Sequence, residues 1–247
     1  MPKTLLIQSH RHPLPFQWIE SCLESVKNWS EQRGFDYRFL GDELFDPVPE
    51  LLMQKTAGQH VIASDLARLF QLQQGLRDGY DTVLWCDADF LIFNAPEFNL
   101  CGSDYALGRE VWVQRDDQGK LRAFSKVHNA FLMFRKGNSF LDFYCDSAQR
   151  LLTGMQAGMP PQFIGPKLLT AIHNIVQCHV MESAGMLSPL VMRDLIAGEG
   201  EALELFRRKS PAPLAGANLC SSLSVAEAFS EQDMAKLMDS LLDNGAC

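Results

Sequence analysis

The amino-acid sequence predicts an α/β fold in which helices flank a mostly parallel central sheet. The chain opens with a strand, a helix and a second strand, an order that joins parallel strands through a helix packed on the sheet. At 247 residues, of which 47% are hydrophobic, the chain can bury a sizeable core. No internal repeat or linker divides it, so we expect a single domain over residues 1–247.

The first half of the chain is expected to supply three strands and two helices. Apolar side chains recur at intervals of three and four residues in "FQWIESCLESVKNWSEQRG", which is typical of an amphipathic helix that ends before Gly34. The segment "ASDLARLFQLQQGLRDGY" has a similar stripe, and Ser64 is suited to cap its start. The strands expected here span residues 4–10, 36–40 and 83–93.

The second half is expected to contain a hairpin and further helices. "DYALGREVWVQ" and "NAFLMFRKG" have the composition of strands, and "RDDQGK" between them is typical of a hairpin turn or a loop. A helix is expected in "SFLDFYCDSAQRLL", and a Gly/Pro loop followed by a helix in "GMQAGMPPQFIGPKLLTAIHN". "ALELFRRK" is interpreted as a strand, and "SEQDMAKLMDSLL" as a terminal amphipathic helix.

Charge and cysteine content limit the partners and the compartment. A net charge of -8 argues against a nucleic-acid partner, because binding a phosphate backbone requires clustered Lys and Arg. The 7 cysteines are odd in number and widely spaced, without a CxxC pair, which favours reduced thiols in a cytoplasm. The N-terminal apolar run is too short for a signal peptide, and no segment approaches the about 18 apolar residues that span a bilayer. We expect a cytoplasmic protein with at most peripheral membrane contact.

Two carboxylates interrupt the apolar run at residues 83–93. An unpaired carboxylate inside an apolar layer is costly, so Asp87 and Asp89 are expected where the strand leaves the core. Alternate strand residues point the same way, and ligands collect beyond the carboxyl ends of strands in open α/β sheets. The pair is therefore suited to hold Mg²⁺ or Mn²⁺ that bridges a diphosphate. The alternative is that one carboxylate caps the following turn and the other is solvated.

The segment "SDLARLFQLQQGLRDGYDTVLWCDAD" resembles the signature of family 32 sugar-nucleotide glycosyltransferases and of the large clostridial glucosylating toxins. In that signature Ser-Asp-x-x-Arg on a helix precedes Asp-x-Asp by about one helix and one strand. The strand "DTVLWC" separates Tyr80 from Asp87 here, a longer gap than the family usually has, which is closer to related bacterial branches. The residues that carry the resemblance are Ser64, Asp65, Arg68, Gly79, Tyr80, Asp87 and Asp89.

Shorter segments extend this resemblance to about two thirds of the chain. "MPKTLLIQSH" is similar to the family's first strand, and "HNAFLMFRKGNSFL" to its Asn-x-hydrophobic strand, with Asn129 at the Asn position. "FIGPKLLT" is similar to its Thr-Gly-Pro loop, with Ile164 in place of Thr. The resemblance implies a GT-A fold, with a nucleotide-binding half at about residues 1–95 and an acceptor half at about 96–247.

The resemblance also implies roles for four catalytic residues. Asp65 and Arg68 lie three apart on a helix and share a face, and in the family this pair reaches the donor sugar and its phosphate. The alternative for them is a surface ion pair near a helix N-terminus, worth about 0.3–1 kcal/mol. Asp89 is expected to hold the cation directly, and Asp87 to hold the cation or the ribose.

Residues near the donor are expected in several loops. The loop after the first strand, His10-Arg11-His12, lies where the base would be approached, with a solvated basic loop as the alternative. We assign no role to the four histidines beyond this loop. The residues expected to contact the nucleotide sugar are Gln8, Ser9, His10, Asp65, Arg68, Asp87, Asn129, Gly165 and Pro166.

The segment "GANLCSSL" stands where the family commonly carries a metal-binding His followed by Ser-Trp. Asn218 replaces that His and Leu223 replaces the Trp. An amide oxygen is an acceptable ligand for a hard cation, so the expected metal ligands are Asp87, Asp89 and Asn218.

The sequence thus predicts a metal-dependent transferase that moves a hexose from a nucleotide diphosphate sugar to a glycan or glycolipid acceptor. A UDP-sugar is favoured over a GDP-sugar, and the resemblance implies retention of the anomeric configuration. One alternative is a catalytically impaired sugar-nucleotide-binding protein, for which Asn218 and Leu223 argue. The other is a phosphatase with Asp-x-Asp at a strand end, but such enzymes have a Thr where this chain has Leu91.

Overall fold

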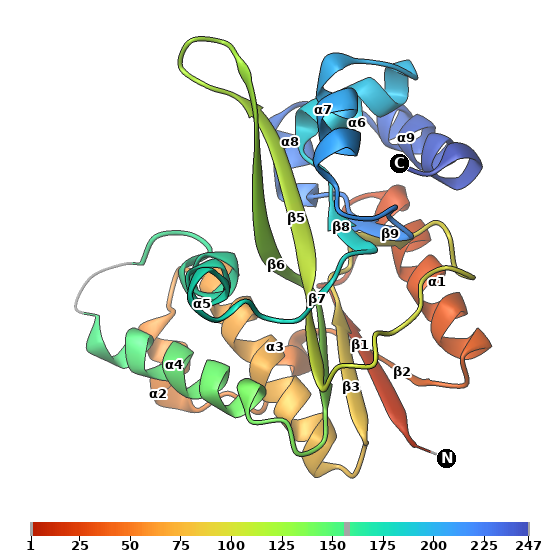
Figure 1. Cartoon of the computed structure of the whole chain (residues 1–247). Coiled ribbons are helices and arrows are strands. Elements are labelled where there is room, and N and C mark those ends of the chain that lie inside the picture. Colours follow the sequence, from red (N-terminus) through yellow and green to blue (C-terminus); the bar gives the residue numbers. More distant parts are fainter. Residues whose placement is uncertain (1, 156–158, 247) are drawn as a thin grey trace.

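A computed structural model describes residues 2–155 and 159–246, which form a mixed α/β fold around a six-stranded sheet (Figure 1). The strand order is β2-β1-β3-β6-β5-β7. β6 is antiparallel to both of its neighbours, whereas the other five strands run in one direction, so the predicted mostly parallel sheet is confirmed. The strands are β1 (Thr4–Ser9), β2 (Asp36–Leu40), β3 (Thr82–Cys86), β5 (Tyr105–Arg115), β6 (Leu121–Arg135) and β7 (Val180–Met181).

Helices cover both faces of this sheet (Figure 1). One face carries α2 (Glu50–Lys55), α3 (His60–Arg77), α4 (Phe140–Gly154) and α5 (Leu168–Val176); the other carries α1 (Gln17–Gln32) and, beyond it, α6 (Pro189–Ala197), α7 (Glu201–Lys209), α8 (Ser221–Ala226) and α9 (Glu231–Asn244). Single helical turns lie at Asp42–Phe45 and Phe163–Lys167.

The central strands are apolar on both sides because both sides are covered. In β3, Val83 and Trp85 pack in the core with α3, whereas Leu84 and Cys86 pack in the core with α1. β1 alternates in the same way, and a strand buried on both faces has the near-continuous apolar sequence found here.

The expected single strand at residues 83–93 is wrong, because two strands of different sheets divide it. β3 ends at Cys86, and the chain turns at Asp87–Asp89, where the Phe90 amide donates to the Asp87 carbonyl at 3.0 Å. The chain then enters β4 (Phe90–Ile92) of a three-stranded sheet. β4 pairs antiparallel with β9 (Gly216–Asn218), and β9 pairs in turn with β8 (Ala184–Met186). The two carboxylates therefore occupy the junction between the sheets.

Two further local predictions are wrong. Residues 202–209 belong to helix α7, which buries Ala202, Leu203 and Phe206 at helical spacing, with Glu in its first turn and Arg and Lys in its last. Helix α3 begins at His60, so Ser64 lies within it and does not cap it. The strand expected from Asn129 is longer than predicted, since β6 begins at Leu121. The other expected helices and strands are confirmed within one to a few residues, although residues 156–158 of the Gly/Pro loop lie outside the described residues.

The β5–β6 hairpin extends well beyond its neighbours, and its outer half projects from the sheet (Figure 1). The strands pair from Tyr105–Phe134 out to Arg115–Leu121, with a register shift between Leu107 and Gly108. Asp116 closes the predicted turn, since its Oδ1 accepts the Gln118 and Lys120 amides at 3.1 and 2.9 Å.

The register shift accommodates a buried histidine. A Cβ at Gly108 would overlap the His128 ring, so only glycine fits there. Nδ1 of His128 accepts the Ala130 amide at 3.1 Å, and Nε2 lies 3.2 Å from the Ala184 carbonyl oxygen, which suits the neutral ring. Burial is the main cause that lowers the pKa of His128 to about 4. This histidine joins β6 to β8, which is a structural role.

None of the described helices is both long and apolar enough to cross a bilayer. The six cysteines within the described ranges are free, and five of them are buried. Burial raises the pKa of the Cys22, Cys86 and Cys220 thiols well above the usual value, so these groups stay protonated and unreactive.

We predict that His128 makes the fold acid-sensitive. Its pKa is about 4 when folded, against 6.5 for a free ring, so the unfolded chain binds more protons in mild acid. This stability is complete above about pH 6.5 and is lost, up to about 3 kcal/mol, as pH falls through about 4. Urea unfolding from pH 7.5 to 4 should show His128→Gln lacking this loss. The control is His60→Gln at an exposed position, and parallel curves for parent and His128→Gln would contradict the prediction.

Candidate active site

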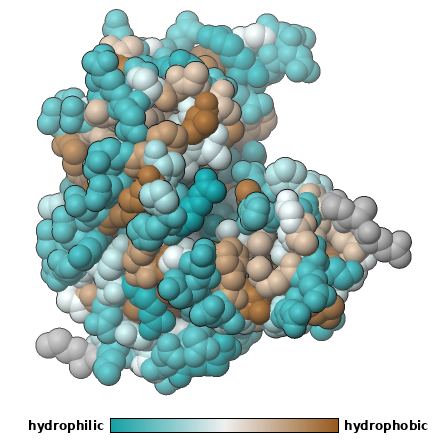
Figure 2. All heavy atoms as spheres, turned by 180° about the vertical axis from the view of Figure 1, so that it is seen from behind, coloured by the Kyte–Doolittle hydropathy of each residue, from teal (hydrophilic) through white to brown (hydrophobic). Residues whose placement is uncertain are grey.

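A cleft of about 420 Å³ opens where β3 ends, between α3, the β5–β6 hairpin and the segment that contains β9 and α8. Figure 2 shows the face on which the surface is hollowed, with hydrophilic and hydrophobic side chains around the hollow. The lining residues include the four predicted catalytic residues together with Asn129, Pro166 and Asn218. The complete lining is Val61, Asp65, Arg68, Asp87, Asp89, Glu110, Trp112, Gln114, Lys126, Asn129, Gln162, Pro166, Met186, Asn218, Cys220, Ser222 and Leu223.

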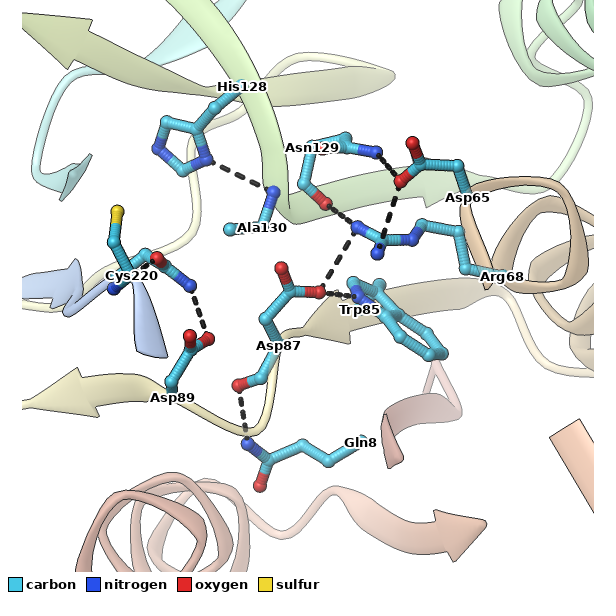
Figure 3. Close-up of polar contacts among 11 residues, drawn as sticks. Gln8, Asp65, Arg68, Trp85, Asp87, Asp89, His128, Asn129, Ala130 and Cys220 are labelled. Atoms are coloured by element: carbon cyan, nitrogen blue, oxygen red, sulfur yellow. Dashed lines mark hydrogen bonds and ion pairs between the residues drawn. The ribbon is translucent and has the colours of Figure 1, made fainter. Parts of the chain in front are cut away.

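Arg68 lies at the centre of a buried network (Figure 3). Its Nη1 donates to the Asn129 carbonyl oxygen at 2.7 Å and lies 3.1 Å from Asp87 Oδ1. Its Nη2 lies 3.3 Å from Asp65 Oδ1, and the guanidinium carbon lies 5.0 Å from the Trp85 ring centre. Burial disfavours the charge, but Asp87 and Asp65 together raise the pKa of Arg68 above its usual value. The network therefore contains a permanent cation.

Asp65 presents one oxygen that lacks a partner. Its Oδ1 accepts from Asn129 Nδ2 at 2.7 Å, whereas Oδ2 is buried without a hydrogen-bond partner in the part of the chain that the structure describes. Burial raises the pKa of Asp65, although Arg68 and Asn129 oppose this effect. An unsatisfied buried acceptor is costly, so a ligand hydroxyl at this oxygen would be stabilising. Asp65 does not form the exposed ion pair that was the alternative, since it is 3% exposed.

Gly165 lies against this acceptor and leaves no room for a side chain. A Cβ at Gly165 would lie 2.5 Å from Asp65 Oδ2 and 2.7 Å from Asn129 Nδ2. The neighbouring Pro166 lines the cleft. The Gly-Pro loop, α3 and β6 therefore meet at Asp65.

Asp87 connects the network to the end of β3. Its Oδ1 accepts from Trp85 Nε1 at 2.7 Å as well as facing Arg68, and its amide donates to the Ala130 carbonyl at 2.9 Å. Burial is the largest cause that raises the pKa of Asp87 to about 6; Arg68 opposes it, and the nearby charge of Asp89 adds to it.

Asp89 is held by the C-terminal part of the chain. Its Oδ1 accepts from Asn218 Nδ2 at 2.5 Å and its Oδ2 accepts the Ser221 amide at 2.7 Å. The oxygen of Asn218 accepts the Cys220 amide at 2.8 Å, so the amide nitrogen faces Asp89. The structure thus brings Asn218 to the expected carboxylate, whereas its predicted role as a metal ligand requires rotation of the amide.

The three expected donor contacts on β1 and after it lie away from this cleft. Gln8 is fully buried; its Nε2 donates to the Asp87 carbonyl at 3.1 Å and its Oε1 accepts from the Tyr37 hydroxyl at 3.1 Å. Gln8 therefore supports the backbone of Asp87. Ser9 and His10 are half-buried at the end of β1, and His10 Nδ1 lies 2.8 Å from the Arg11 carbonyl oxygen.

A second cleft, of about 380 Å³, lies beyond the ends of β1 and β2. Its wall combines two aromatic rings, 5.3 Å apart between centroids, with two carboxylates. The lining residues are His12, Phe39, Gly41, Asp42 and Glu43. The loop predicted to approach the base thus contributes His12 to a cleft.

Four cleft residues on the hairpin did not emerge from the sequence. Glu110, Trp112 and Gln114 on β5 and Lys126 on β6 line the same cleft as the two aspartates. A signal was present for the three residues of β5, which alternate within a predicted strand and so share a face, whereas Lys126 precedes the strand predicted from Asn129. The sequence did not indicate which face of the hairpin is turned to the site.

Asp87 and Asp89 suit an open divalent-cation site. They line one cleft and influence each other electrostatically, so a cation there would relieve the repulsion that helps to raise the pKa of Asp87. The described residues form no group of three or more His, Cys, Asp or Glu that could hold a metal. Water and substrate oxygens would have to complete the coordination, which is common for Mg²⁺.

Comparison with solved structures identifies the fold. A glycosyltransferase involved in the glycosylation of the major capsid of PBCV-1 shares a TM-score of 0.54 and 10% identity, over 96% of this chain and 100% of that chain. Galactosyltransferase LgtC, solved with donor and acceptor sugar analogs, shares a TM-score of 0.46 and 14% identity over 96% and 95% of the two chains. No protein-family model and no curated protein matches the sequence. The first likeness and the sheet topology confirm the expected GT-A fold.

We predict that Gly165→Ala disrupts the Asp65–Asn129 contact. The added methyl group would overlap both side chains, so the free energy of unfolding in urea should fall by about 1–3 kcal/mol. The matched control is Gly102→Ala, where a Cβ would meet no atom within 4 Å. Equal stability of the two variants would show that the loop yields without disturbing Asp65.

Proposed function

We propose that this protein is a glycosyltransferase that moves a hexose from a nucleotide diphosphate sugar to a glycan or glycolipid acceptor. The observation that carries the proposal is the arrangement of Asp65, Arg68, Asp87 and Asp89 around one cleft at the carboxyl end of β3 in a GT-A fold. The Ser-Asp-x-x-Arg and Asp-x-Asp pattern is the reason to place it near family 32, and that family's retention of anomeric configuration is adopted with it.

Arg68 and Asp65 are assigned to the phosphates and the hexose. A guanidinium donates several hydrogen bonds in one plane, and Arg68 already spans Asp65 and Asp87, so phosphate oxygens near it meet a fixed positive charge. The unpartnered Oδ2 of Asp65 would accept a hydrogen bond from a hexose hydroxyl. Together these groups hold the donor with its anomeric carbon in the cleft.

The nucleoside is assigned to the second cleft. The rings of His12 and Phe39 offer a surface for a base, and Asp42 and Glu43 offer acceptors for ribose hydroxyls. A UDP-sugar is the favoured donor, with GDP-sugars as the alternative. Ser9 and His10, at the end of β1, are assigned to the same nucleotide. Gln8 is assigned an indirect role, because it hydrogen-bonds to the Asp87 carbonyl.

Asp87 and Asp89 are assigned to Mn²⁺ or Mg²⁺, with Asn218 as a third ligand after rotation of its amide. A divalent cation here would offset the charge that develops on the departing diphosphate. Asp87 Oδ1 stays oriented by Trp85 and Arg68, and the Ser221 amide keeps Asp89 turned into the cleft.

The two alternative functions have weaker support. In the phosphatase hypothesis Asp87 is the nucleophile, but its Oδ1 is engaged by Trp85 and Arg68. Leu91, at the position where such phosphatases have a Thr, is buried in β4. The hypothesis of an impaired binding protein rests on Asn218, which stands at the position of the family's His and hydrogen-bonds to Asp89. Hydrolysis of UDP-hexoses without an acceptor separates an active transferase from a binding protein. We further propose a cytoplasmic location with at most peripheral membrane contact.

We predict that Asp89→Asn removes cation-dependent binding of UDP. Replacing one carboxylate oxygen by an amide nitrogen takes away a ligand and a charge, so UDP affinity in Mn²⁺ should fall at least about tenfold. Isothermal titration calorimetry of UDP, with Mn²⁺ and with EDTA, measures this difference. Asp117→Asn at the exposed hairpin turn is the matched control. The assignment fails if Asp89→Asn binds UDP with the same Mn²⁺ dependence as the parent.

We predict that carboxylates of the two clefts affect different parts of the donor. Asp65→Asn should reduce the affinity for UDP-hexoses about tenfold more than the affinity for UDP, because Asp65 is assigned to the hexose. Asp42→Asn should reduce both affinities by the same factor, because Asp42 is assigned to the ribose. Calorimetry with UDP and a panel of UDP-hexoses gives the ratios. Equal losses for Asp65→Asn would exclude its contact with the sugar.

A further inference from the structure

The inner side of the β5–β6 hairpin is a polar and aromatic surface turned to the cleft. Cross-strand pairs place Glu110 opposite Lys126, and Trp112 opposite Phe124, on one face of the hairpin. Glu110, Trp112 and Lys126 line the cleft, and Lys126 Nζ lies 3.6 Å from Glu110 Oε1. Phe124 is 43% exposed. This face, defined by these four residues, is named the hairpin face.

The opposite side of the hairpin is already occupied. Val111 and Val113 are buried in the core that contains α6 and α7, and Leu121 and Ala123 pack against the same core. One side of the hairpin therefore provides its stability. Neither aromatic residue of the hairpin face is among the core residues of the described ranges: Trp112 is half-buried where it lines the cleft, and Phe124 is exposed. Both rings are therefore accessible to a ligand.

The chemistry of the hairpin face suits a sugar ring. A pyranose has an apolar face of C–H groups that stacks on an aromatic ring, while its hydroxyls project from the rim. Trp112 supplies the ring, Glu110 accepts from hydroxyls, and Lys126 donates to hydroxyl oxygens. Glu110 is only 8% exposed, and its ion pair with Lys126 is long at 3.6 Å, which leaves its carboxylate with capacity for further hydrogen bonds.

The width of the aromatic surface indicates the size of the ligand. Directly paired residues on antiparallel strands have Cβ atoms about 4.5–5.5 Å apart, so the Trp112 and Phe124 side chains start from neighbouring positions on this face. Lys126 Nζ lies 5.8 Å from the Phe124 ring centre, which places its charge at the edge of this surface. A face that carries aromatic side chains at two neighbouring positions offers stacking surface to more than one sugar ring.

We propose that the hairpin face is the acceptor subsite and that it binds a saccharide of at least two sugar rings. One ring stacks on Trp112 with its hydroxyls on Glu110 and Lys126, and the next extends towards Phe124. This assignment rests on the proposed transferase function, because it deepens the role of the same cleft. It commits to the saccharide part of the acceptor, whether the saccharide is free or attached to a lipid.

The test compares Trp112→Ala with Phe143→Ala, which removes an aromatic side chain that is 53% exposed on α4. Both variants and the parent are applied with UDP to an array of mono-, di- and trisaccharides, printed free and as glycolipids. The parent should bind at least one saccharide of two or more rings, and Trp112→Ala should bind it at least tenfold more weakly. Trp112→Phe, which keeps a ring, should retain most of the binding even if Trp112→Ala folds poorly.

A second measurement separates this proposal from the proposed function. With the saccharide found on the array, the ratio of hexose transfer to UDP-hexose hydrolysis should fall at least tenfold in Trp112→Ala and Glu110→Gln, but not in Phe143→Ala. Saccharide binding through Trp112, with neither hexose transfer nor UDP-hexose hydrolysis by the parent, would keep the saccharide site and refute the transferase. The subsite would be overturned if the parent hydrolysed UDP-hexoses but bound no saccharide on the array. It would also be overturned if Trp112→Ala and Phe143→Ala bound the saccharide equally well. Binding of free saccharides and glycolipids alike would support the saccharide assignment, and binding that follows the lipid alone would refute it.

Discussion

The buried guanidinium of Arg68 is the group on which the arrangement of the cleft depends. It joins α3 to β6 through the Asn129 carbonyl and to the end of β3 through Asp87, while its helix neighbour Asp65 closes the network. Breaking a buried ion pair typically costs about 3–5 kcal/mol, because a charge is left without compensation. Apolar residues of similar size would often stabilise such a site equally well. The presence of these buried charges, with one carboxylate oxygen of Asp65 lacking a partner among the described residues, is therefore better explained by a ligand than by stability.

The sequence predicted those helices and strands in which the spacing of apolar residues shows which face is buried. Helix α1, the hairpin and the opening strands follow from such patterns, because each buries a face along its length. The run at residues 83–93 was misread since both β3 and β4 are apolar on both sides, and nothing local marks the change of sheet except the two aspartates. The strand that pairs with β4 is the three-residue β9, at Gly216–Asn218, far along the chain. Residues 202–209 did carry a helical signal, in the charges at their two ends, that the strand interpretation overlooked.

For the site, the motif located the residues that share the cleft but not the contacts among them. Asp65, Arg68, Asp87 and Asp89 line one cleft as expected, whereas Gln8 is buried behind it as a support for Asp87. The contributions of Glu110 and Trp112 depend on which face of a long hairpin is turned to the cleft. That choice follows from the packing of the other face on α7, a contact distant in sequence that the hairpin's own pattern does not indicate. Residues selected by a motif were thus predictable, and residues placed by tertiary packing were not.

The C-terminal segment makes the site a property of the whole chain. Asp89 is bonded through its side chain to Asn218 and the Ser221 amide, and through its carbonyl to the Leu219 amide. These contacts join β3 to β9 and α8 across about 130 residues. Helix α8 also turns Ser222 and Leu223 into the cleft. Any ligand that draws on the oxygens of Asp89 therefore competes with the hydrogen bonds that hold α8, and thermodynamic linkage requires the position of α8 to affect that ligand's affinity in return.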